Sequence, residues 1–346
     1  MNGKYTKEYQ KIIKSRLFCL LTNSSSDLFF SLEDYRNNYF NSDNPHKIIE
    51  FYNSFDNREQ LIQWMKERPK GIANIFEIEG NKEIIVVIPT ADFNGKYAKE
   101  CRENIFRGLH IVFVESGGRG DFYFNFAHNT NVGIRRALEY NPKWILFSGD
   151  DMYKIDDASV LIERLKNLDP ERFSMVFTNE TNYHSIPSQF CKARFTRFFI
   201  LILIRVIGNF NWVDHFKITI GKLKTERRFQ CKYHTIASRK FRYSMYKHGF
   251  NFISFTAFGI FSASYIKSLS GNLYDENFVN SNEDHDIAIK FFLEKSSYTF
   301  IDYKIGDYVG SSLGNGINRE LRTFAGLAYL NYKVQQMKQS HIFHDH

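Results

Sequence analysis

Two adjacent carboxylates follow an apolar run near the middle of the chain. The run Trp144 to Phe147 leads through Ser148 and Gly149 to Asp150 and Asp151. An apolar run of this length that ends in a turn signal is typical of a buried parallel strand. Its acids would then lie at the carboxyl edge of a sheet, where open α/β sheets bind ligands. Carboxylates there suit Mg²⁺ or Mn²⁺, which prefer oxygen ligands and bridge to phosphates, whereas capping of a following helix is the simpler alternative.

Two other expected strands also end in polar residues. The β-branched run Ile84 to Ile88 stops at Pro89 and Thr90, and the run Leu109 to Val114 stops at Glu115. Because the carboxyl ends of parallel strands meet at one edge, we expect these residues to converge with the Asp pair. Glu115 can accept a hydrogen bond from a base or a ribose. The sequence has no Gly-rich phosphate loop, so a bound diphosphate would need a cation.

A second acidic cluster precedes an apolar run late in the chain. Glu283, Asp284 and Asp286 surround His285 and lead into Ile287 to Phe292. Acids in the first turn of a helix are favoured by the helix dipole, by about 0.3–1 kcal/mol each. Three acids within four residues exceed what capping requires. One of them is therefore a candidate general base that deprotonates a hydroxyl nucleophile.

Alternating strand and helix patterns surround the strand ends. The expected strands are 84–88, 109–114, 144–147 and 173–177, and the expected helices are 96–106, 129–140 and 157–168. Repeated units of this kind with short links imply a mainly parallel sheet with right-handed crossovers, flanked by helices. The pattern predicts an α/β fold.

The two ends of the chain have patterns of their own. Capping-box spacing from Asp56 to Glu59 predicts a helix over 57–67, and a strand is expected over 74–78. A terminal helix is expected over 317–338. Its predicted buried side carries Leu321, Phe324, Leu327 and Val334. These segments would flank the α/β region as an N-terminal accessory region and a C-terminal helix.

Composition limits the class of protein. With 346 residues, 43% of them hydrophobic, the chain can bury one large core or two smaller ones. The four cysteines lie far apart and form no CxxC pair, which favours a reducing compartment. Residues 1–14 lack the apolar core of a signal peptide, and the longest apolar run, 198–204, is shorter than the roughly 20 residues that span a bilayer. A cytoplasmic location is expected.

Positive charge is concentrated in one segment. Residues 190–250 hold fourteen Lys or Arg against only Asp214 and Glu226, an excess of +12 in a chain whose net charge is +8. We interpret residues 183–250 as a basic insertion that faces an anionic membrane and gives salt-sensitive binding to anionic vesicles. Within it, residues 195–210 fit either an amphipathic helix in the membrane interface or an ordinary core helix whose Arg197 and Arg205 reach the surface. A solvated basic face is the alternative. Nucleic acid is not an expected partner, because strand-end acids would repel its backbone.

Five segments, in this order and spacing, resemble the GT-A glycosyltransferases, specifically the inverting enzymes of family 2. They are the first strand end Ile88-Pro89-Thr90, the second strand end 114–118, the Asn-x-Gly-x-x-x-Ala pattern over 131–137, the segment 147–151 in the place of an Asp-x-Asp motif, and the loop 271–278 followed by Glu-Asp-x-Asp at 283–286. Gly149 stands where the first acid of the Asp-x-Asp motif belongs. Metal coordination would therefore rest mainly on Asp151.

The resemblance implies a function and a set of site residues. It implies a Rossmann-like GT-A domain over 81–315, between an accessory region over 1–80 and a C-terminal helix and tail over 316–346. The implied enzyme is an inverting transferase of the hexosyltransferase type that uses a nucleotide-sugar donor and Mg²⁺ or Mn²⁺. The implied donor-binding residues are Pro89, Thr90, Glu115, Asn131 and Asp150, the metal ligand is Asp151, and the base is Asp284, with Glu283 as the alternative.

The acceptor and the rival functions follow from the same features. A lipid-linked acceptor or a glycan fits a basic insertion, together with peripheral attachment to the cytoplasmic membrane face. A nucleotidyltransferase shares the sheet and the strand-end acids, but the segment 91–96 is only a weak version of its Gly-rich loop. A non-enzymatic protein that binds nucleic acid or membrane through the basic insertion is the other alternative.

Overall fold

The chain divides into two compact units, Met1–Tyr35 and Arg36–His346. The computed structural model describes residues 32–117, 121–180, 182–183, 210–213, 216–227, 230–234, 257–279, 281–294, 296–308 and 316–339. All contacts discussed below lie within the second unit.

The described helices begin and end as follows. They are α2 (Leu32–Phe40), α3 (Pro45–Asn53), α4 (Arg58–Glu67), α5 (Lys96–Glu100), which a π-helical turn (Cys101–Ile105) continues, α6 (Phe126–Leu138), α7 (Ala158–Lys166), α10 (Ala263–Ser268), α11 (Glu283–Leu293) and α12 (Ile317–Gln339).

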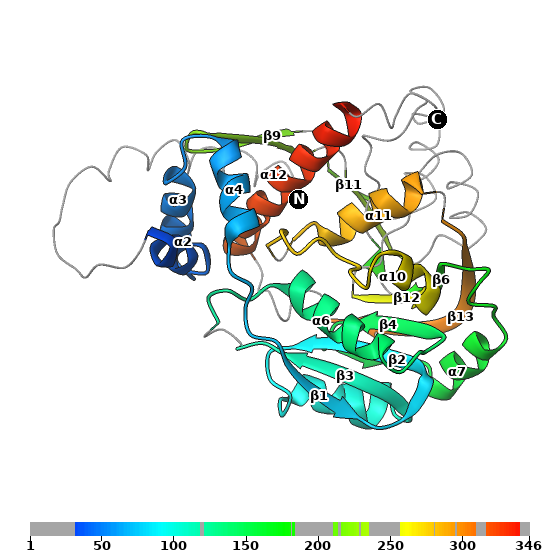
Figure 1. The fold of residues 1–346 in the computed structure, drawn as a ribbon. Coiled ribbons are helices and arrows are strands. Elements are labelled where there is room, and N and C mark those ends of the chain that lie inside the picture. Colours follow the sequence, from blue (N-terminus) through cyan, green and yellow to red (C-terminus); the bar gives the residue numbers. More distant parts are fainter. Residues whose placement is uncertain are drawn as a thin grey trace. The chain divides into compact units, whose positions relative to one another are not determined.

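The described strands form three sheets (Figure 1). The large sheet has the order β1 (Asn74–Ile78), β3 (Leu109–Glu115), β2 (Asn81–Thr90), β4 (Trp144–Ser148), β12 (Phe258–Ser262), β6 (Met175–Glu180), β13 (Tyr298–Asp307) and β5 (Met152–Lys154). The smaller sheets are the hairpin β9 (Phe216–Ile220) with β10 (Leu223–Arg227), and β7 (Asn182–Tyr183), β11 (Gln230–His234) and β8 (Phe210–Val213).

The large sheet is mixed, whereas the sequence predicted a mainly parallel one. Strands β2, β3, β4, β6 and β13 run in one direction, and β1, β12 and β5 run in the opposite direction. Strand β12 separates β4 from β6 and pairs antiparallel with both. Five carboxyl ends still share one edge of the sheet. The prediction of an α/β fold with helices around a large sheet is confirmed.

Alternating side chains of the strands serve two cores. On one face, Ile84, Val86 and Ile88 of β2 pack with α5, the π-helical turn and α7. On the other face, Ile85 and Val87 pack with α6, α10 and α11. Helix α6 lies close against the sheet, because a Cβ on Gly133 would lie 2.5 Å from Val87 Cγ1. Gly133 of the Asn-x-Gly pattern therefore allows a close helix–sheet approach.

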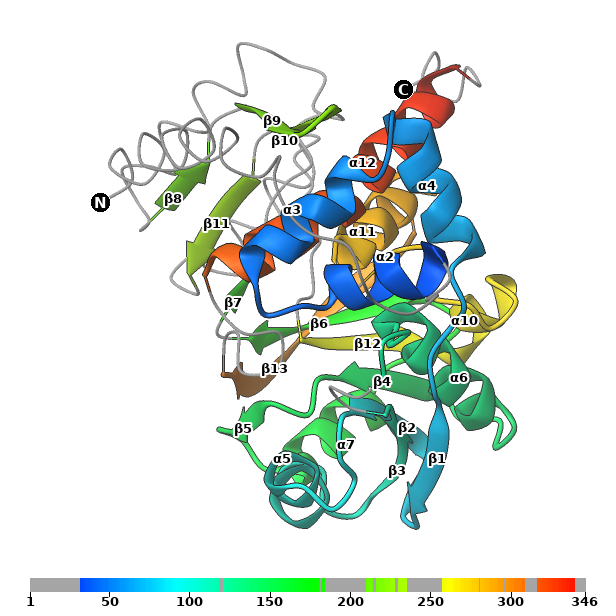
Figure 2. The ribbon, with the colours of Figure 1, turned by 90° about the vertical axis from the view of Figure 1, so that its left-hand side faces the viewer.

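A third core joins segments that are far apart in the sequence. It combines α3 and α4, the end of the hairpin with Ile220 and Leu223, residues of α11, and the apolar side of α12. Figure 2 shows α12 running beside α3, α4 and α11. The predicted accessory region, part of the basic insertion and the C-terminal helix thus share one core. This core therefore contains residues from both sides of the boundaries that the sequence suggested at residues 80 and 315.

Most predicted elements are present, with shifted ends. Helix α4 is capped by Asn57, whose side chain accepts from Gln60 N, so the cap lies one residue later than the Asp56–Glu59 spacing indicated. Helix α6 begins at Phe126 because Asn125 caps it. The four residues expected on the buried side of α12 are all buried. The expected strands 74–78 and 144–147 correspond to β1 and β4.

Other predictions for the ends and the insertion need correction or lie outside the described residues. Helices α2 and α3 and strand β13 were not predicted. The described parts of the basic insertion are strands and the hairpin turn between β9 and β10. The expected helix over 195–210 falls on residues that the structure does not describe, except Phe210, which begins β8. Within the described part of the chain, no helix combines the length and the apolar character that crossing a membrane demands.

Candidate functional site at the carboxyl edge of the sheet

The three strand ends predicted to converge do meet. The Thr90 hydroxyl donates to Asp150 Oδ2 at 2.8 Å, although 60 residues separate them. Thr90 O also accepts from Ser116 N at 2.9 Å, and Thr90 lies opposite Glu115 in the β2–β3 register. The ends of β2, β3 and β4 therefore form one polar surface, called here the strand-end cluster: Thr90, Glu115, Asp150 and Asp151.

Glu115 holds the loop that follows β2. Its Oε2 accepts from the backbone N–H of Phe93 at 2.8 Å. The Phe93 ring stacks on Phe76 with ring centroids 4.5 Å apart, and the Arg102 guanidinium lies 4.9 Å from its centroid. One carboxylate oxygen of Glu115 thus orders an aromatic wall beside the strand ends. This contact is compatible with the predicted role of Glu115 near a base or ribose, and it adds a structural role.

Asp150 is held in an environment that disfavours its charge. Burial is the main cause that raises its pKa from 3.8 to about 6; the Thr90 hydrogen bond opposes the rise, and the negative charge of Asp151 adds to it. Cys101 Sγ approaches Asp150 O at 3.4 Å from the π-helical turn, and burial raises the pKa of that thiol. Carboxyl groups with perturbed pKa values are common at functional sites, because catalytic groups need pKa values that suit their task.

Replacement of Asp150 by Asn should stabilise the protein in a pH-dependent way. Because the folded-state pKa lies above the unfolded value, the penalty on folding is absent below about pH 4, grows as the pH rises toward about 6, and is complete above that. We expect Asp150→Asn to raise the free energy of unfolding by about 1–3 kcal/mol at pH 8 and to change little at pH 4. Urea unfolding at both pH values measures the difference.

The matched control for this experiment is Asp157→Asn. The hydrogen bond from Lys154, together with those from Ser159, lowers the pKa of exposed Asp157 to about 2. The carboxylate form of Asp157 therefore favours folding, whereas that of Asp150 disfavours it. Asn preserves an N-cap at the start of α7. No gain at high pH is expected for this variant. An equal gain for both variants would show that the effect of Asp150→Asn is not caused by the burial of Asp150.

Asp151 lies where two further strands meet the strand-end cluster. Its backbone oxygen accepts from Tyr308 N at 2.8 Å, and the next residue, Met152, lies opposite Asp307 at the carboxyl end of β13. Asp307 is an acid at this edge that no sequence motif had indicated. A Cβ on Gly149 would lie 2.8 Å from Asp151 Oδ1. The missing first acid of the motif therefore leaves room for the carboxylate of Asp151.

The donor set at the strand ends fits one type of metal site. Among the described residues, no group of three His, Cys, Asp or Glu side chains is arranged to hold a metal ion. Mg²⁺ is nevertheless commonly bound by one or two carboxylates together with substrate phosphates, and it keeps several waters. Asp151 and Asp150 fit that description, and a closed all-protein metal site is not indicated.

Pro89 and Asn131, two of the predicted donor-binding residues, are both buried within the protein. Pro89 is buried in β2, opposite Val114 of β3. The Asn131 side chain is fully buried; its Nδ2 donates to Tyr274 O at 2.8 Å and its Oδ1 accepts from Tyr274 N at 3.1 Å. The amide of Asn131 is thus occupied by the loop that precedes α11. These contacts favour an anchoring role for Asn131 over direct contact with a donor.

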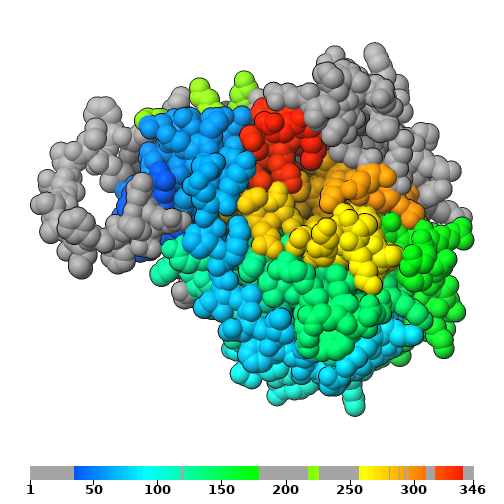
Figure 3. All heavy atoms as spheres, viewed as in Figure 1, coloured from blue at the N-terminus to red at the C-terminus, as the bar shows by residue number. Residues whose placement is uncertain are grey.

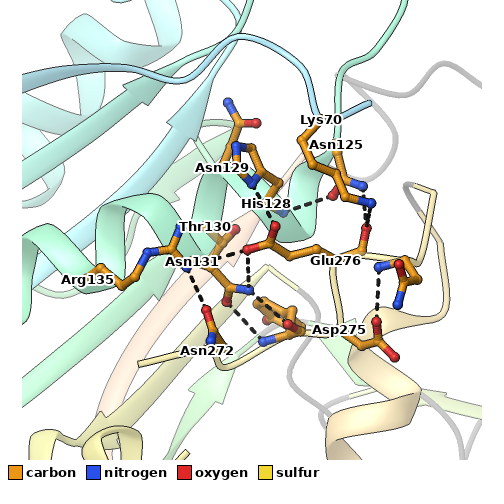
Figure 4. Close-up of polar contacts among 12 residues, drawn as sticks. Lys70, Asn125, His128, Asn129, Thr130, Asn131, Arg135, Asn272, Asp275 and Glu276 are labelled. Atoms are coloured by element: carbon orange, nitrogen blue, oxygen red, sulfur yellow. Dashed lines mark hydrogen bonds and ion pairs between the residues drawn. The ribbon is translucent and has the colours of Figure 1, made fainter. Parts of the chain in front are cut away.

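The same loop is fastened to α6 through Glu276 (Figure 4). Glu276 Oε2 contacts His128 Nδ1 at 2.7 Å, and Oε1 accepts from Asn131 Nδ2 at 3.1 Å. Lys70 Nζ and Asn125 Nδ2 both donate to Glu276 O at 2.8 Å. Burial alone would raise the pKa of Glu276, but the hydrogen bonds from His128 and Asn131 outweigh it and lower the pKa to about 2.

This network fastens the loop that precedes α11 to the first two turns of α6. Asn125 caps α6, and α6 follows β3, so the first turn of α6 lies beyond the carboxyl end of that strand. Glu276 is bonded to that turn, and only six residues separate it from Glu283. Glu276, in the loop over 271–278 that carries part of the resemblance, therefore has a structural role.

The first turn of α11 holds a carboxyl pair. Glu283 is half-buried, and its Oε2 is buried without a hydrogen-bond partner among the described residues. Burial, followed by the charge of Asp284, raises the pKa of Glu283 well above its usual range. Asp284 Oδ1 accepts from His285 N at 2.8 Å and lies 3.0 Å from His285 Nδ1. Burial and the neighbouring charge of Asp284 thus both favour the protonated form of Glu283.

Asp286 is bound by a residue that no sequence motif had indicated. Lys333 Nζ of α12 donates to Asp286 Oδ2 at 2.6 Å and to Asp275 Oδ2 at 2.8 Å. Burial alone would lower the pKa of Lys333, but Asp286 and Asp275 outweigh it and raise the pKa. In the sequence, Lys333 reads as a polar residue of an amphipathic helix. No local signal indicates its two distant partners.

Comparison with known proteins does not identify a family. No protein-family model matches the sequence. No curated protein matches it significantly either. Function must therefore be inferred from the geometry of the strand-end cluster and of α11.

Proposed function

We propose that this protein is an inverting glycosyltransferase with a GT-A fold that uses a nucleotide-diphosphate sugar. The observation that carries the proposal is the hydrogen bond from Thr90 to Asp150, which joins the ends of β2 and β4 beside Glu115. Ligands of open α/β sheets bind at this edge. The resemblance in the order of the five motifs supports the finer assignment to GT-A.

The donor would lie along the strand-end cluster. Glu115 and the aromatic wall of Phe93 lie on the side of a base or ribose, and Asp150 with Thr90 lies toward the sugar and diphosphate. Asp151, assisted by Asp150, would hold Mg²⁺ or Mn²⁺. When bound, the cation supplies positive charge against the diphosphate that leaves, and electrostatic stabilisation of this kind usually contributes more to catalysis than any other effect.

The base would come from the first turn of α11. In a single displacement, the Asp284 carboxylate accepts the proton of the acceptor hydroxyl, and the acceptor oxygen forms its bond to the anomeric carbon. The bond from that carbon to the diphosphate oxygen breaks, and the electron pair leaves with the nucleotide diphosphate. Protonated Glu283 cannot accept the proton, which favours Asp284 for this role.

A nucleotidyltransferase is the competing enzyme. Its Gly-rich loop would bind phosphates through backbone N–H groups after the first strand. Here the corresponding N–H groups are used within the protein: Phe93 N binds Glu115, Asn94 N binds Asp92 Oδ1, and Gly95 N binds Asp92 O. This turn favours the glycosyltransferase.

A thermal-shift panel tests the proposal. Nucleotide-diphosphate sugars and nucleoside triphosphates are compared with and without Mn²⁺. A ligand at a hundredfold excess over Kd should stabilise the folded protein by about 2.7 kcal/mol. We expect a nucleotide-sugar to stabilise more with Mn²⁺ than without it, and the best donor then enters a transfer assay. Stabilisation by triphosphates alone would instead favour a nucleotidyltransferase.

The acceptor lies beyond this proposal. The predicted lipid-linked or glycan acceptor, the anionic membrane surface and the peripheral location all depend on the basic insertion. Most of that insertion falls outside the described residues. Its described hairpin uses Ile220 and Leu223 for packing, and Lys222 pairs with Asp56 at the surface.

A further inference from the structure

A buried ammonium group links the C-terminal helix to the acidic start of α11. Lys333 Nζ lies 2.6 Å from Asp286 Oδ2 and 2.8 Å from Asp275 Oδ2, and the three side chains are only 21%, 10% and 21% exposed. The second oxygen of Asp286 is buried and has no hydrogen-bond partner among the described residues. Lys333 therefore pairs with Asp286, although burial outweighs this attraction and raises the pKa of Asp286.

The same helix also fixes the loop that carries Asp275. Tyr329 OH donates to Asp275 Oδ2 at 3.1 Å and accepts from Asn277 Nδ2 at 3.3 Å. Lys333 and Tyr329 lie one helical turn apart on α12, so both reach the loop from one face. Asp275 and Asp286 would repel each other without Lys333. The ammonium thus holds loop and helix together at one point.

Asp286 lies in the same helical turn as the candidate base. Asp286 follows Glu283 by three residues, a spacing that puts two side chains on the same helix face, about 5–6 Å apart. Asp284 belongs to the same turn. Figure 3 shows the red surface of α12 between the blue N-terminal helices and the yellow-to-orange segment that leads into α11. A substitution of Lys333 would therefore alter the position of the turn that carries Glu283 and Asp284.

We propose that Lys333 is a positioning residue for catalysis, which orients the first turn of α11 by binding Asp286 and Asp275 together. The inference rests on the proposed transferase, in which that turn supplies the base. A misplacement of about 1 Å can lower a rate about 10²-fold, because reaction depends on the alignment of the reacting groups. Lys333 acts through Asp286 and the helix, and it makes no contact with substrate in this mechanism.

A purely structural role gives different expectations. Buried ion pairs are weak evidence for stability, because desolvation offsets much of their attraction, while removal of one partner alone destabilises strongly. The third core already fastens α12 through apolar residues such as Phe324 and Leu330. Removal of the charges of Lys333 and Asp286 together should therefore recover part of the stability without restoring the orientation, because Asp275 keeps its hydrogen bonds from Tyr329 and from Asn277 N. Stability and rate can be separated by this difference.

The variants are Lys333→Met, Lys333→Arg and the double variant Lys333→Met/Asp286→Asn, all in the full chain. Arg322→Met is the matched control, because Arg322 is a cation of the same helix that binds Ser42 O at 2.8 Å and Asn41 O at 3.1 Å, away from α11. The measurements are kcat and donor KM with the best nucleotide-sugar, the melting temperature, and hydrogen exchange of the amides of residues 284–287.

We expect Lys333→Met to lower kcat about 10–100-fold with donor KM within about twofold, and Lys333→Arg to recover most of kcat. The double variant should melt at a higher temperature than Lys333→Met and still turn over slowly. Exchange at 284–287 should accelerate in both Met-containing variants at position 333 and stay unchanged in Arg322→Met. A double variant with wild-type kcat, or with unchanged exchange, would overturn the inference.

Failure of the proposed function gives a distinct result. If the wild-type chain transfers no sugar from any donor of the panel, the transferase proposal fails. Hydrogen exchange then still decides whether Lys333 orders the first turn of α11. Accelerated exchange would support the orienting role of Lys333, and unchanged exchange would overturn it.

Discussion

Replacement of Asp151 by Asn should lower sugar transfer by about 10³-fold, which corresponds to about 4 kcal/mol. Asn keeps the size of the side chain and removes the charge that would hold the cation against the donor diphosphate. Donor affinity should fall as well, because no Gly-rich loop is present to bind the phosphates instead. Transfer rates at saturating donor and Mn²⁺-dependent thermal shifts measure the two effects.

The control for this experiment is again Asp157→Asn. Asp157 is an exposed acid at the start of α7, and its side chain accepts from Ser159 N as an N-cap. Asn is an equally good cap, so donor binding and transfer should stay at wild-type levels. Normal turnover by Asp151→Asn at saturating donor would show that the cation assignment is wrong.

The site could be predicted as far as it depends on strand ends. Buried runs that stop at Thr90, Glu115 and Asp150 follow directly from local composition, and parallel strands bring such ends together. The direction of β12 could not be predicted, because a short apolar strand looks the same in either orientation. Its antiparallel pairing depends on where the chain re-enters the sheet after the insertion.

The polar networks behind the site could not be predicted, because they join residues without a local pattern. Lys70 and Glu276 are separated by 206 residues, and Lys333 and Asp275 by 58. In the sequence, Glu276 stands in the loop over 271–278 that resembles a motif of the GT-A family. In the structure, His128 and Asn131 satisfy it. Local sequence indicates which residues can do chemistry, and only packing indicates which of them are already engaged.

The start of α11 gives the second large prediction. Asp284→Asn preserves the shape and the hydrogen-bond acceptor for His285 N, but it removes the group that takes the acceptor proton. We expect kcat to fall by about 10²–10⁴-fold with little change in donor affinity. Steady-state kinetics with varied donor, together with a thermal shift for donor binding, separate the two quantities.

Glu283→Gln is the matched comparison, because the two carboxyl groups are neighbours with different protonation. Burial and the charge of Asp284 raise the pKa of Glu283, which favours its protonated form, and Gln imitates that form. This variant should keep most of kcat. If Glu283→Gln loses more activity than Asp284→Asn, then Glu283 is the base. If both variants melt earlier and turn over normally, the acids of α11 serve only to stabilise the first turn of the helix, by about 0.3–1 kcal/mol each.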